Sequence, residues 1–134
     1  MEKELVARFD AKRGEIKGNL AAMLVEDKYI DYFDIVKTVI KAVHDGYGTP
    51  DPDKIHVIDD GDYQGTLVYV IPEKCYQPSD YWYVRIYYGS CSGCDTLQGI
   101  LYDNDDFETK VNGLFTLALH IVQRLRKMDN DSGI

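Results

Sequence analysis

The chain has 134 residues, 45% of them hydrophobic, and a formal net charge of −8. This length is enough for one domain with its own core, so we expect residues 1–134 to form a single domain. The excess of acidic residues argues against direct binding to nucleic acid or to an anionic membrane surface, because both need a basic patch on the protein.

The sequence also predicts where in the cell the protein is located. No window is apolar for long enough to cross a membrane, and the first residues are polar, without the apolar region of a secretory leader. Three cysteines are an odd number, which favours free thiols in a reducing compartment over disulfides. We therefore expect a cytoplasmic protein.

Apolar residues at helical spacing predict one helix over 3–26 and a second over 29–44. Gly14 and Gly18 lie inside the first helix, where each glycine costs about 1 kcal/mol relative to alanine. Two interpretations are open: a small-residue face for a partner helix, or a locally poor helix that tertiary packing rescues. The second is favoured, since tertiary context commonly overrides propensity.

Residues 54–58, 66–71 and 81–88 predict three strands, of which the first two form a hairpin. Eleven tyrosines are unusual for this length, and they gather around these strands. One face of the third strand is expected to meet the helices, and it carries Trp82, Val84, Ile86 and Tyr88. The other face faces solvent or forms a binding surface, and it carries Tyr83, Arg85 and Tyr87.

A short helix is predicted over 95–102, with Asp95 as its N-cap and Gln98 three residues later, as in a capping box. The last helix begins at Phe107 and is expected to end in a basic turn that includes Arg126 and Lys127, as the helix dipole favours. The predicted fold class is α+β: two N-terminal helices, a three-stranded antiparallel sheet, a short helix and a long C-terminal helix packed on one face of the sheet. Open sheet edges need cover, and a homodimer would pair them.

The segment between the third strand and the short helix is the candidate site. It consists of Gly89, Ser90, Cys91, Ser92, Gly93, Cys94 and Asp95. Backbone N–H groups of a glycine- and serine-rich loop at a helix start can hold an anion, although a carboxylate at the cap opposes it. Neither a P-loop nor a dinucleotide-binding motif matches. We expect a ligand to contact the glycines, serines and Asp95 of this loop together with Tyr83, Arg85 and Tyr87.

Cys91 and Cys94 have C-x-x-C spacing, for which three interpretations are open. A thiol pair at a helix start is typical of redox proteins, but here no strand pair follows the helix. The pair could supply half of a zinc site. The remaining ligands would come from separate elements: Cys75, His44, His56 or His120. The third interpretation, small buried side chains in a sharp turn, is favoured for the thiols, and no histidine is singled out.

The run from Tyr88 to Gln98, which contains GSCSGCDTLQ, and the run from Leu117 to Arg124 resemble small uncharacterised proteins encoded by bacteriophages. The resemblance covers roughly the C-terminal third of the chain. It implies a phage accessory protein in the cytoplasm of a bacterial host, and it brings no known activity.

These observations together predict a non-enzymatic, acidic binding protein that engages a host protein or a small ligand, and that interferes with host defence or transcription. No cofactor is expected. The competing prediction is a metal-binding or thiol-redox protein that uses Cys91 and Cys94 at the junction of strand and helix.

Overall fold

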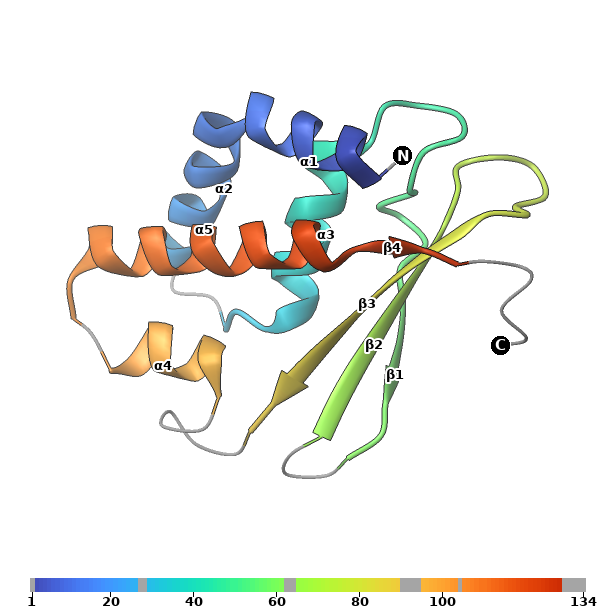
Figure 1. Ribbon diagram of the computed structural model, residues 1–134. Coiled ribbons are helices and arrows are strands. Elements are labelled where there is room, and N and C mark those ends of the chain that lie inside the picture. Colours follow the sequence, from blue (N-terminus) through green and yellow to red (C-terminus); the bar gives the residue numbers. More distant parts are fainter. Residues whose placement is uncertain (1, 27–28, 62–64, 90–94, 104, 129–134) are drawn as a thin grey trace.

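The structure is a computed structural model that describes residues 2–26, 29–61, 65–89, 95–103 and 105–128. The helices are α1 (Glu2–Ala11), α2 (Arg13–Val25), α3 (Tyr32–Val43), α4 (Thr96–Tyr102) and α5 (Phe107–Arg124). The strands are β1 (His56–Asp59), β2 (Gly65–Pro72), β3 (Tyr81–Tyr88) and β4 (Arg126–Lys127). Figure 1 shows a helical layer beside the sheet, with α5 leading directly into β4. The predicted α+β class is confirmed.

The sheet is antiparallel, with its strands in the order β1-β2-β3-β4. The three predicted strands are present, and β4 is an addition that the sequence analysis missed. The last helix was predicted to continue through Lys127, but it ends at Arg124, and Arg126 and Lys127 pair with Tyr83 and Trp82. Leu125, which lies between the end of α5 and the start of β4, has an extended backbone and is fully buried. Burial and strand pairing outweigh helix propensity here, and a two-residue strand has no periodicity to detect.

The single helix predicted over 3–26 is in fact two helices, separated at Lys12, whose backbone leaves the helical region (φ −117°, ψ 24°). The break allows α1 and α2 to approach the core separately. Each helix buries two large apolar side chains: Leu5 and Phe9 from α1, Ile16 and Leu20 from α2. Tertiary packing determines this break. The spacing of apolar residues does not predict it, because both helices have the same helical period.

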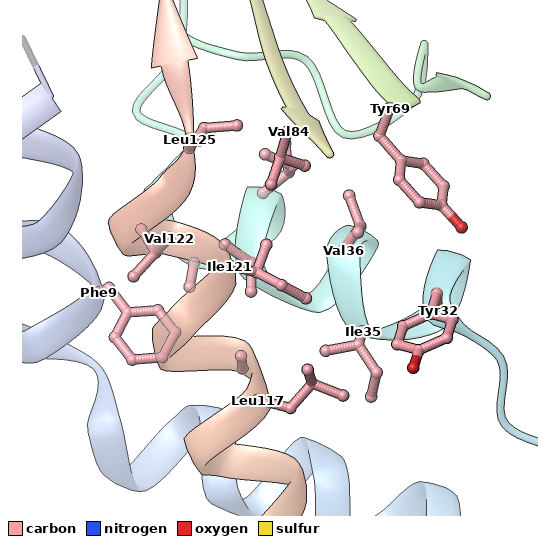
Figure 2. Packing of buried hydrophobic residues seen from close by; sticks show 14 of the residues in the cluster. Phe9, Tyr32, Ile35, Val36, Tyr69, Val84, Leu117, Ile121, Val122 and Leu125 are labelled. Atoms are coloured by element: carbon pink, nitrogen blue, oxygen red, sulfur yellow. The ribbon is translucent and has the colours of Figure 1, made fainter. Parts of the chain in front are cut away.

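One hydrophobic core joins the helices to the inner face of the sheet (Figure 2). From the sheet it takes Tyr69, Ile71, Trp82, Val84 and Ile86, all buried. The predicted alternation along β3 is therefore confirmed: Arg85 and Tyr87, on the other face, are exposed. Among the helices described, none combines the length and apolarity needed to cross a lipid bilayer.

Candidate functional site

A pocket of roughly 360 Å³ lies between the N-terminal end of α3, the start of α4 and the inner face of the first three strands. We call it the tyrosine pocket, because its lining includes six aromatic residues: Tyr29, Tyr32, Phe33, Tyr69, Tyr88 and Tyr102. Leucine, isoleucine and valine make up half of the remaining lining residues. The volume and the mixture of apolar walls with a few polar groups are typical of small-molecule sites.

Asp95 organises one wall of the pocket and is only 6% exposed. Its Oδ1 accepts hydrogen bonds from the Tyr32 hydroxyl (2.9 Å) and the Gln98 backbone N–H (3.0 Å), and its Oδ2 accepts one from the Gly89 N–H (2.8 Å). The predicted N-cap role of Asp95 is confirmed. Gln98 does not return to the cap as a capping box requires; its side-chain amide donates to the Gly89 carbonyl instead (3.1 Å). The Asp95 carboxylate thus ties α3 and the end of β3 to the start of α4.

Tyr32 completes this network from the helix side. Its hydroxyl donates to Asp95 and also accepts the Leu97 N–H at 3.1 Å. Burial is the main cause that raises the pKa of Tyr32 above its usual value; the Asp95 carboxylate adds to this effect, and the bond from Leu97 opposes it. The hydroxyl therefore remains protonated and donates at neutral pH.

Tyr69 differs from Tyr32 although both residues line the pocket. Figure 2 shows the two tyrosine side chains, one on the sheet and one on α3. The Tyr69 side chain is 2% exposed and its ring packs against Phe33, with centroids 6.4 Å apart. Within the described part of the chain, the Tyr69 hydroxyl makes no hydrogen bond, and it is not fully enclosed by protein atoms. Burial, and then the charge of Asp31, raises the pKa of Tyr69. A protonated, unpartnered hydroxyl therefore reaches the pocket from an otherwise buried residue.

Two further carboxylates lie at the rim. Asp31 is the N-cap of α3: its Oδ1 accepts from the Asp34 N–H (3.0 Å), and the Asp34 side chain accepts from the Asp31 N–H (3.1 Å). Asp59, at the end of β1, accepts from the Tyr88 hydroxyl (2.6 Å) and the Gly61 N–H (3.0 Å), again through Oδ1. The bond from Tyr88 is the main cause that lowers the pKa of Asp59. Among the lining residues that the structure describes, the acidic side chains are three aspartates, and lysine, arginine and histidine are absent.

The predicted site residues do not form one surface. Gly89 and Asp95 are buried and line the tyrosine pocket on the inner side of the sheet. Tyr83, Arg85 and Tyr87 lie on the opposite face of β3, where the Arg85 guanidinium carbon is 5.5 Å from the centre of the Tyr83 ring. The other predicted members lie outside the described residues: Ser90, Cys91, Ser92, Gly93 and Cys94.

Most of the residues that line the pocket could not be predicted from the sequence. Tyr32 and Tyr69 were placed in a helix and a strand, but nothing in their local spacing brings them together. The unusual number of tyrosines was the one available signal. The number of tyrosines indicated that aromatic side chains would cluster, but it did not indicate where in the fold.

The predicted zinc and redox roles of Cys91 and Cys94 fall outside the described residues and stay predictions. The other proposed ligands lie on separate elements. His44 caps the end of α3 with Nδ1 2.9 Å from the Pro50 carbonyl, and Cys75 contacts Glu73 in the turn after β2. His56 is on β1 and His120 on α5. In the part of the chain that can be described, no three histidine, cysteine or acidic side chains group as metal ligands would.

Comparison of the chain with protein-family models, with curated proteins and with solved structures gives no match. The bacteriophage resemblance of the GSCSGCDTLQ motif stays a prediction.

Proposed function

We propose that this protein binds a small organic molecule in the tyrosine pocket. The observation that carries the proposal is the Tyr69 hydroxyl, a polar group on a 2% exposed residue that faces the pocket without a hydrogen-bond partner. A poorly solvated polar group is costly unless it is hydrogen-bonded, and a bound molecule would supply the missing bond. The aromatic and aliphatic walls would hold the apolar part of the same molecule.

Binding without catalysis fits the chemistry of the lining. The described lining residues include no serine, cysteine, histidine or lysine, and their titratable side chains are aspartates and tyrosines. Asp95, the most buried of the carboxylates, already accepts three hydrogen bonds. This supports the small-ligand form of the predicted binding function. Engagement of a host protein, for which Tyr83, Arg85 and Tyr87 are the candidate surface, is a separate prediction.

The test uses two neighbouring substitutions on β1. Val57 lines the pocket and is 50% exposed, whereas Ile58 is 58% exposed and points to the other face of the strand, opposite Val68. We expect Val57→Trp to fill the pocket mouth and Ile58→Trp to leave it open. Because both side chains are largely exposed, neither substitution should prevent folding.

A fragment library is screened by ¹H–¹⁵N correlation spectra of the wild-type protein. We expect compounds that shift the amide signals of Leu97 and Tyr69, with dissociation constants unchanged in Ile58→Trp and at least about tenfold weaker in Val57→Trp, a difference of about 1.4 kcal/mol. The proposal fails if every bound compound has the same affinity for the two variants. It also fails if no compound shifts the pocket signals.

A further inference from the structure

We infer that the ligand of the tyrosine pocket is a small organic cation: a primary or secondary ammonium group attached to an apolar or aromatic body. This inference deepens the proposed function and rests on it. It is supported by the charges at the pocket, by the aromatic lining and by the position of the Tyr69 hydroxyl.

The carboxylates at the pocket favour a ligand with a positive charge. Asp31 and Asp59 approach the pocket from two different elements, the start of α3 and the end of β1. Each carboxylate uses Oδ1 for its hydrogen bonds within the described chain, which leaves Oδ2 as an acceptor. An ammonium group would form charge-assisted hydrogen bonds with these oxygens. An anionic ligand would instead be repelled, because the lining described contains no lysine, arginine or histidine.

The aromatic lining adds a second attraction for a cation. Tyr29 and Tyr102 are largely exposed and belong to segments on either side of the pocket, while Tyr32 and Tyr69 line its interior. The negative face of an aromatic ring attracts an ammonium group within about 6 Å of its centre. The net charge of −8 favours the approach of cations over anions in general.

The Tyr69 hydroxyl should make the pocket prefer a cation that carries N–H groups over one that has none. A hydroxyl oxygen has two lone pairs, so it can accept a hydrogen bond from an ammonium N–H. The same hydroxyl is then satisfied by the ligand that the rim carboxylates attract. A pocket of roughly 360 Å³ has room for an aromatic ring with a short chain, which makes aromatic amines suitable probes.

Three probes of similar size separate charge from shape: 2-phenylethylammonium, 2-phenylethanol and 3-phenylpropanoate. They are titrated into the protein at pH 7 by NMR and by calorimetry. We expect the ammonium to bind at least about tenfold more tightly than the alcohol, and the carboxylate to show no binding at the pocket. Binding of the ammonium should be lost in Val57→Trp and kept in Ile58→Trp.

Asp31→Asn and Asp59→Asn test the rim carboxylates directly. Asparagine keeps the shape of both side chains and, at Asp31, the N-cap function, so the fold should be retained. Each substitution should weaken the ammonium at least threefold and leave the alcohol unchanged. Asp105→Asn, an exposed carboxylate between α4 and α5 that does not line the pocket, is the matched control and should leave both probes unchanged.

Failure of this inference can be distinguished from failure of the proposed function. Equal affinity of the ammonium and the alcohol, both sensitive to Val57→Trp, would overturn the cation preference while small-molecule binding stands. An equal loss in Asp105→Asn and Asp59→Asn would show general attraction to an acidic protein and would also overturn it. If no library compound is sensitive to Val57→Trp, both proposals fail.

Discussion

Tyr32 and Tyr69 are two buried tyrosines in one pocket with opposite hydrogen-bonding situations. The Tyr32 hydroxyl donates to Asp95 and accepts from the Leu97 N–H, so it belongs to the framework of the fold. The Tyr69 hydroxyl has no hydrogen-bond partner in the described chain. The contrast separates the structural role of Tyr32 from the binding role that we propose for Tyr69.

Substitution of each tyrosine by phenylalanine tests this contrast. Tyr32→Phe leaves the buried Asp95 carboxylate and the Leu97 N–H each short of a partner, which should reduce the free energy of unfolding by about 1–3 kcal/mol. Tyr69→Phe removes an unpartnered, poorly solvated hydroxyl, so it should leave the free energy of unfolding unchanged or raise it by up to about 1 kcal/mol. Urea unfolding of the two variants beside the wild type measures both. A larger loss in Tyr69→Phe than in Tyr32→Phe would contradict these assignments.

At the scale of the elements, the two glycines of α2 lie on its exposed side. An added Cβ at Gly14 or Gly18 would meet nothing within 4 Å, so neither glycine is needed for close packing in the described chain. Gly113 in α5 is different, because a Cβ there would lie 3.0 Å from Cγ2 of Ile100 in α4. The same residue type thus has opposite packing constraints in two helices.

We therefore expect Gly18→Ala to raise the free energy of unfolding by about 0.5–1 kcal/mol, because alanine is the better helix former and the space is open. Gly113→Ala should gain less or be destabilising, since the Ile100 side chain must shift to admit the methyl group. Both are measured by urea unfolding. A loss of stability in Gly18→Ala would contradict the open environment and favour a packing role for this face.

At the scale of the whole molecule, the helices and the sheet share one hydrophobic core. Helical residues such as Phe9 and Leu114 belong to the same buried cluster as Trp82 and Val84 of the sheet. Trp82, the only tryptophan, is fully buried within this cluster. Its fluorescence therefore reports on the junction between helices and sheet, while far-UV circular dichroism is dominated by the helices.

Because the core is shared, the two signals should follow one unfolding curve in urea, with the same midpoint and slope, as for a two-state domain. This experiment also tests the prediction that residues 1–134 form a single domain. Two separated transitions, with the tryptophan signal lost before or after the helical signal, would show that the helices and the sheet unfold as independent units.

Local sequence patterns were enough to determine the class of most elements. Period-two alternation identified the two faces of β3, helical periodicity identified α3 and α5, and Asp95 before an apolar segment identified a helix cap. These features are local because a backbone conformation and its hydrogen bonds depend on neighbours a few residues away.

Only the tertiary structure decided the break between α1 and α2, the strand β4 and the tyrosine pocket. Each depends on contacts between distant parts of the chain: Tyr32 and Asp95 are 63 residues apart, and β4 pairs with β3 more than 40 residues before it. Such contacts form because burying apolar surface and pairing polar groups outweigh local preference, and no short sequence window contains both partners.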